Sequence, residues 1–325
     1  DGGYRTGAVV GAYVLDSKWG LDQGFDFYFD RFDTDREQGF SVADVQRRGG
    51  EVVDEAVRWL GGNRGGPFFL FVHLYDPHTP YDPPPPFRDE YRDRPYLGEI
   101  AYADAEVGRL VKFLASEGLD ATTAVVLCSD HGESLGEHGE RTHGMLLYDG
   151  ALRIPLIVAG PGVPEAEHRR PVSIVDVAPT VLRLAGIAVP GGMQGRDLFS
   201  GPGDAHEVYA ETLYPRALGW SALTALVEDR WKVIAPDGGG EELYDIASDP
   251  AERENTASRR PEVVQAAVSR LAAIKHAEAP PASATASAEA QERLRALGYV
   301  GSAPSATPAA GGAVNPAARI ATWVA

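Results

Sequence analysis

AVVLCSDHGESLGEHGERTHG, residues 124–144, is the stretch that decides the fold, because an apolar run ends there in a loop with three histidines and four acidic residues. Residues 124–128 predict a buried strand, and an Asp-His pair at its end would be desolvated without a partner. Asp130 offers a carboxylate oxygen and His131 an imidazole nitrogen, donors that suit Ca²⁺, Mn²⁺ or Zn²⁺. The pattern predicts a metal site, with a solvated polar loop as the alternative.

Strand-like and helix-like patterns alternate on both sides of this stretch, which is typical of an α/β core. We expect helices over residues 42–60, 97–116, 175–185 and 261–275, and strands over 68–74, 154–159, 207–212, 221–227 and 230–235. The last three strands predict a small antiparallel unit. Three regions follow: an α/β core (1–204), an antiparallel sheet plus helix (205–280), and a helix with a flexible tail rich in Ala, Pro, Ser and Gly (281–325).

Composition and charge limit the class of protein. A hydrophobic content of 44% over 325 residues is enough for one large core with a smaller appended unit. The net charge of −17 argues against nucleic acid as a partner, and no apolar run reaches the roughly 20 residues of a membrane span. The single cysteine, Cys128, excludes an intrachain disulfide framework and leaves the compartment open. A lone strand cysteine predicts inert packing.

Seven segments, in order, resemble the sulfatase family of the alkaline-phosphatase superfamily. They are GYRT (3–6), KWGLDQGFD (18–26), FFLFVHLYDPHTPY (68–81), SDHGE (129–133), LRIPLIV (152–158), SIVDVAPTVL (173–182) and ELYDIASDPAEREN (242–255). The resemblance implies an alkaline-phosphatase-like central sheet flanked by helices. It also implies that a formylglycine hydrolyses a small-molecule or glycan sulfate ester with the help of one divalent metal. Ca²⁺ is the metal expected first, with Mn²⁺ and Zn²⁺ as alternatives.

The same resemblance assigns roles to five side chains. Asp130 and His131 are expected to be metal ligands, and His78, in a proline-rich loop, is expected to contact the transferred sulfate. His143 stands where many sulfatases have a lysine, so it is expected to stabilise charge or protonate the leaving group. Lys18 is either an anion contact or an ordinary surface lysine. His78 and His143 are the expected catalytic residues, and both, with Lys18, the expected substrate contacts.

The chain also departs from the family pattern. Sulfatases carry a pair of metal-binding aspartates and a Cys-x-Pro-x-Arg motif upstream of the segment that begins this chain, and neither occurs here. We therefore expect a fragment without its N-terminal nucleophile region, inactive by itself. Gly20 stands where the family has a histidine. His73 and His138 are expected to be structural.

Some features of the sequence fit functions other than sulfate-ester hydrolysis. Residues 132–136 match Gly-x-Ser-x-Gly, the nucleophile elbow of serine hydrolases, but the residues that follow do not predict the required helix. No aspartate has a histidine four positions later, which favours a single metal and keeps phosphonate monoester or phosphodiester hydrolysis as alternatives. An inactive scaffold module is a further alternative. Residues 314–325 resemble a helix start that leads, in some family members, into a downstream helical-repeat domain.

Overall fold

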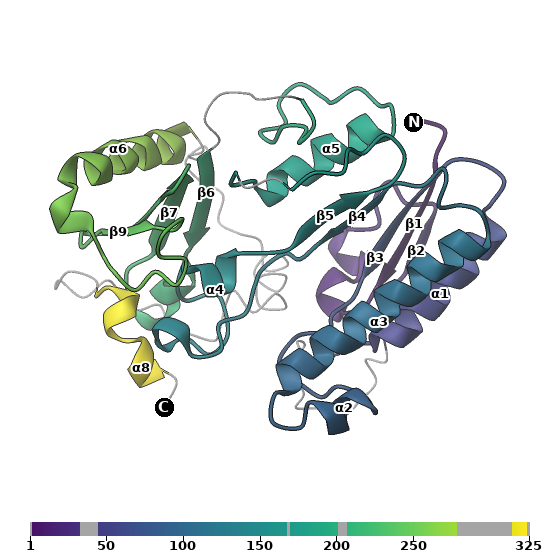
Figure 1. The fold of residues 1–325 in the computed structure, drawn as a ribbon, viewed down its shortest axis with the longest axis horizontal. Coiled ribbons are helices and arrows are strands. Elements are labelled where there is room, and N and C mark those ends of the chain that lie inside the picture. The colour runs from purple at the N-terminus through teal and green to yellow at the C-terminus, as the bar shows by residue number, and fades with distance from the viewer. Residues whose placement is uncertain (1, 33–44, 168–169, 201–206, 278–313, 324–325) are drawn as a thin grey trace. The chain divides into compact units, whose positions relative to one another are not determined.

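The computed structural model describes residues 2–32, 45–167, 170–200, 207–277 and 314–323. The described residues divide into two compact units, with the boundary between Ala124 and Val125, and each is described by itself (Figure 1). Among the described residues, no helix combines the length and the apolarity needed to cross a membrane.

The first unit is a parallel sheet with helices packed against it. The strand order is β2-β1-β3, with both outer strands parallel to β1. The elements are β1 (Arg5–Val10), β2 (Phe27–Phe29), β3 (Phe68–His73), α1 (Gly49–Gly62), α2 (Phe87–Glu90) and α3 (Pro95–Ser116), with two 3-10 turns at Tyr13–Leu15 and Ser17–Trp19. Both α1 and α3 lie along the sheet in Figure 1.

The core of this unit joins β1 to one face of α1. Val9, Val52 and Ala56 are fully buried, and Val52 and Ala56 lie four residues apart, so they share one face of the helix. Trp59 on the same helix lies so close to Gly7 that a Cβ there would be 2.7 Å from the indole ring. Glycine at position 7 therefore lets α1 approach β1.

The predicted start of the first helix is wrong. The expected range was 42–60; residues 33–44 lie outside the described part of the chain, and the helix begins at Gly49. The preceding backbone is extended because Arg47 N donates to Gly11 O (2.7 Å) and its guanidinium donates to Val10 O (2.8 Å). These contacts tie the segment to the end of β1, which the local helical periodicity could not reveal.

The second unit begins with β4 (Val125–Cys128), which pairs with β5 (Leu156–Ala159) in antiparallel fashion. The short helix α4 (Asp149–Leu152) precedes β5, and α5 (Val177–Leu184) follows it. Residues 124–128 were expected to form a buried strand. The strand is present, but the prediction that it is buried is wrong, because β4 is half-buried and Cys128 is exposed. In the described part of the chain β4 has only β5 as a neighbour, and a two-stranded ribbon buries little of its surface.

A four-stranded antiparallel sheet completes this unit. Its order is β6-β7-β8-β9, formed by β6 (Glu207–Thr212), β7 (Leu223–Glu228), β8 (Trp231–Pro236) and β9 (Glu242–Asp245). Helix α6 (Pro261–Ala277) packs against β7 and β8 through Ala267 and Leu271, and Figure 1 shows it beside this sheet. The predicted antiparallel unit is therefore present, with β9 as an additional strand that we did not predict.

A second core cluster of this unit gathers segments that are distant in the chain. Residues 145–148, which follow the histidine-rich loop, pack with Leu223, Ile234 and Ile320. Ile320 begins the short helix α8 (Ile320–Trp323), preceded by a 3-10 turn at Pro316–Ala318. Most of the predicted linker lies outside the described residues. A parallel sheet, helices and a small antiparallel sheet confirm the predicted α/β class.

Candidate active site

Asp130 and His131, directly after β4, present two donor atoms to the same space. His131 Nε2 lies 3.7 Å from Asp130 Oδ2, while His131 Nδ1 lies 2.8 Å from Gly132 O. A carbonyl oxygen can only accept, so Nδ1 donates to it and Nε2 is the ring nitrogen on the side of Asp130. If an ion lay about 2.3 Å from each donor, the donor–ion–donor angle would be roughly 105–110°, which ordinary coordination geometry allows.

The surroundings of this pair differ from the prediction. The Asp130 side chain is 76% exposed and that of His131 is 36% exposed, so the pair is not desolvated in the way a buried strand end would require. The cause is the incomplete cover of the β4-β5 ribbon. Across the described ranges, no three His, Cys, Asp or Glu side chains are grouped to hold a metal ion. The pair fits two positions of a coordination shell and no more.

His143 lies against this pair. Its ring stacks on that of His131, with centroids 3.8 Å apart and planes 25° apart. His143 Nδ1 lies 3.1 Å from Glu133 Oε1, and the Glu133 side chain is only 3% exposed. A carboxylate accepts, so Nδ1 donates to Glu133 and this contact fixes the orientation of the ring. Sequence reasoning missed Glu133, because nothing in its spacing singled it out among the acidic residues of the loop.

The loop that brings His143 back to His131 is held from inside. Glu140 is 1% exposed and accepts from the amides of Met145 (2.8 Å) and Leu146 (3.2 Å). Burial raises the pKa of Glu140 to about 7, although both amides lower it. A Cβ on Gly132 would lie 2.4 Å from the Gly150 carbonyl oxygen, so only glycine permits this return of the chain.

The nucleophile-elbow alternative does not fit the geometry. Ser134 is 2% exposed, and the only helical turn that follows it in this loop is the 3-10 turn Glu137–Gly139, interrupted by the left-handed backbone of His138 (φ 52°). An elbow needs an exposed serine at the start of a helix. His138 instead stacks on Tyr148 with ring centroids 3.6 Å apart and contacts Ala251 O, which is a structural arrangement.

In the first unit, His78 is held by its own loop. Its Nδ1 lies 2.7 Å from Thr79 O, and its Nε2 lies 3.2 Å from the Tyr75 hydroxyl. The Tyr75 ring also stacks on the imidazole, with centroids 4.2 Å apart. Tyr75 is a second residue that sequence reasoning missed. His73 accepts from Gly11 N at 3.3 Å, as a structural histidine would.

Lys18 is exposed and lies against two aromatic rings of the same unit. Its Nζ is 4.2 Å from the centroid of Tyr13 and 4.1 Å from that of Trp19. These cation–π contacts fix the ammonium group, which suits an anion contact and a surface lysine equally. Lys18 and His78 belong to one unit and Asp130, His131 and His143 to the other.

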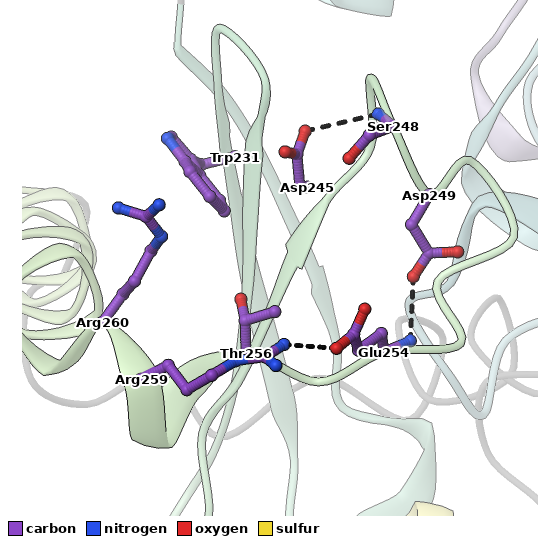
Figure 2. Close-up of a pocket in the computed structure, with 8 residues that line it drawn as sticks. All are labelled: Trp231, Asp245, Ser248, Asp249, Glu254, Thr256, Arg259 and Arg260. Atoms are coloured by element: carbon purple, nitrogen blue, oxygen red, sulfur yellow. Dashed lines mark hydrogen bonds and ion pairs between the residues drawn. The ribbon is translucent and has the colours of Figure 1, made fainter.

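The second unit also contains a cavity of about 460 Å³, between the ends of β8 and β9 and the segment before α6, with none of the predicted site residues in its lining (Figure 2). Most of its charged groups pair locally: Glu254 with Arg259, and Asp249 with the Glu254 amide. Asp245 forms an ion pair with Arg230, and Arg260 stacks on Trp231. These contacts support the fold rather than a reaction centre.

Comparison with known proteins identifies related sequences. Residues 1–187 match the family model described as Sulfatase, and residues 136–276 match that described as N-sulphoglucosamine sulphohydrolase, C-terminal. Choline-sulfatase of Rhizobium meliloti (strain 1021) is 34% identical over 170 residues, or 50% of this chain and 33% of the relative. Arylsulfatase K of Xenopus laevis is 31% identical over 220 residues, or 62% of this chain and 41% of the relative. The matched segments therefore cover between a third and two fifths of the length of these two relatives.

Solved structures with the same fold cover most of the chain. One, of Ps i-CgsB in complex with k-i-k-neocarrahexaose, has a TM-score of 0.70 at 20% identity and covers 90% of this chain and 76% of its own. Another, in complex with its substrate D-glucosamine-2-N,6-O-disulfate, has a TM-score of 0.65 at 22% identity, with coverages of 84% and 80%. The phosphonate monoester hydrolase of Agrobacterium radiobacter scores 0.65 at 19% identity, with coverages of 85% and 78%.

Proposed function

Because the chain belongs to the sulfatase family, we propose that the full-length protein hydrolyses a sulfuric ester and that residues 130–143 form one side of its catalytic centre. One observation carries the proposal: the stacked rings of His131 and His143 lie beside the Asp130 carboxylate, within the region that the family model matches. A metal-type donor pair and a hydrogen-bonding imidazole are thus brought together in one loop.

The donor pair fits one divalent cation. Asp130 Oδ2 and His131 Nε2 would hold it, and the hard carboxylate oxygen is compatible with Ca²⁺, with Mn²⁺ or Zn²⁺ as alternatives. When bound, such an ion supplies positive charge that polarises a sulfuryl oxygen. The remaining ligands and a formylglycine nucleophile are proposed to lie in the full-length protein outside residues 1–325.

The histidines of this chain would act on the group that is transferred. Glu133 holds the His143 ring in its orientation through Nδ1, and Nε2 is the ring nitrogen that we propose donates to a sulfuryl oxygen or to the leaving oxygen. His78 is proposed as a catalytic residue and Lys18 as a substrate contact on the strength of the family motifs that contain them.

The ester itself is proposed to be carried by a small molecule or a glycan. Two structural neighbours support the glycan, since one was solved with a neocarrahexaose and the other with a disulfated glucosamine. The phosphonate monoester hydrolase of the same fold keeps that reaction as the second candidate. Sulfate, phosphate and phosphonate esters all present tetrahedral oxyanions, so the residues described here suit each of them.

The test uses the full-length protein. Turnover of matched aryl sulfate, phosphate monoester, phosphate diester and phosphonate monoester substrates is measured together with bound metal by elemental analysis. We expect the sulfate ester to be preferred and Asp130→Ala to lose both activity and metal. Asp104→Ala, at an exposed position of α3, is the control and should retain both. A preference for the phosphonate, or full metal content in D130A, would overturn the respective part of the proposal.

A further inference from the structure

Glu99 is a buried acid on α3 that the proposed reaction does not use. It is 3% exposed, and its Oε1 accepts from the backbone amide of Asp82 at 2.8 Å. We propose that Glu99 is a positioning residue that fixes the loop of residues 76–82 and thereby the His78 imidazole. This inference rests on the proposed role of His78 in sulfuric-ester hydrolysis.

The loop that carries His78 is anchored at both ends by side chains that bind neighbouring backbone or charges. Asp76, at its start, accepts from the amide of Gly49 at the first turn of α1 (2.9 Å). Asp82, at its end, accepts from Arg88 (2.7 Å) and Arg48 (2.8 Å). The side chain of Asp82 is held in this way, and the backbone amide of Asp82, at the same end of the loop, is held separately.

Glu99 supplies that support through the backbone. Burial raises the pKa of Glu99 to about 7, and the amides of Asp82 and His78 counteract that rise. The other carboxylate oxygen of Glu99, Oε2, is buried and meets no hydrogen-bond donor within the described residues. The hydrogen bonding of the carboxylate to the loop backbone is therefore the main interaction that offsets its lost hydration.

The His78 ring is tied to neighbouring residues of the chain by two hydrogen bonds. Its Nδ1 meets Thr79 O and its Nε2 meets the Tyr75 hydroxyl. If the loop shifts, ring and hydrogen-bond partners shift together. A displacement of about 1 Å at a reacting group can cost on the order of 100-fold in rate, so the support from α3 should be visible in turnover.

Two substitutions test the proposal in the full-length protein. Glu99→Leu keeps the volume and removes the acceptor, and we expect kcat to fall by about 10-fold or more with KM changed by less than about 3-fold. Glu99→Gln keeps one carbonyl acceptor and should restore most of the activity. Asp104→Leu, on an exposed position of the same helix, should leave kcat unchanged. If E99L does not fold, Glu99→Asp, which withdraws the oxygens by one methylene, replaces it.

A double-mutant cycle separates positioning from a general effect on the fold. If Glu99 acts through His78, E99L should lower kcat no further once His78 is replaced by Ala. Multiplicative losses in the double variant would overturn the proposal. Histidine-selective ¹⁵N NMR, with His78 assigned through His78→Gln, supplies a measurement independent of turnover. E99L should shift the His78 resonances and D104L should not; unchanged His78 resonances refute the inference even if the protein hydrolyses no sulfate ester.

Discussion

Lys232→Met is the substitution whose cost the structure defines best. Lys232, on β8, is fully buried, with Nζ 2.8 Å from Asp149 Oδ1 and 2.7 Å from Glu252 Oε1. Glu252 is itself 2% exposed, and its Oε2 accepts from the Asp149 amide at 2.6 Å. One ammonium thus joins the sheet to the start of α4 and to the loop after β9.

The magnitude follows from leaving a buried carboxylate without its cation. Removing one partner of a buried ion pair costs about 3–5 kcal/mol, and Met fills a similar volume, so the cavity term is small. Burial raises the pKa of Glu252 and Lys232 lowers it, so losing the lysine raises it further. A raised carboxyl pKa removes stability as pH increases through it. The deficit of K232M should therefore be largest at neutral pH and above, and smallest below about pH 4.5.

Urea unfolding of the chain, followed by circular dichroism at pH 7.5 and pH 4.5, measures this. Lys275→Met is the control, since that side chain is 43% exposed and its 3.3 Å pair with Asp237 lies at the surface; it should cost less than about 1 kcal/mol. Adding Glu252→Gln to K232M should recover a large part of the loss. A deficit below about 1 kcal/mol for K232M at pH 7.5, or no recovery in the double variant, refutes the reasoning.

Two further predictions concern the loop of the candidate site. Burial raises the pKa of Glu140 to about 7, so the wild-type protein should become less stable as the pH rises from 4.5 to 8. Over this range its free energy of unfolding should fall by up to about 3 kcal/mol more than that of Glu140→Gln. Urea titrations in which both proteins show the same pH dependence would contradict this prediction. Glu133→Gln in the full-length protein should lower kcat about 10- to 100-fold while KM stays within about 3-fold, whereas Glu137→Gln, at an exposed position of the same loop, should not. Equal kinetics of the two variants would disprove the role of Glu133.

Local patterns were sufficient for elements that local forces build. The helix expected over 97–116 is Pro95–Ser116, where proline opens the first turn and an apolar residue recurs every three or four positions. The strand expected over 124–128 is Val125–Cys128. In both cases the side chains that define the element lie within one continuous segment. The boundaries and types therefore followed from sequence, whereas the burial of β4 did not.

Features that depend on distant partners were missed. β9 has only four residues and exists because β8 pairs with it, so its own sequence carried little signal. The contact between Glu133 and His143 spans ten residues without any periodicity. It forms because buried Glu140 binds the amides that follow His143 and closes the loop. Spacing alone could suggest that three histidines share a loop, but not which of them stack.

The buried carboxylates explain how so acidic a chain can arrange these loops. Asp76, Glu99, Glu140 and Glu252 are each at least nine-tenths buried, and each accepts from a backbone amide of a loop or helix start. Burial raises the pKa of all four, so hydrogen bonds, and for Glu252 a lysine, must offset lost hydration. Such residues cannot serve as surface charge. Part of the acidic composition is therefore internal, where Asp76 and Glu99 hold the loop of His78 and Glu140 holds that of His143.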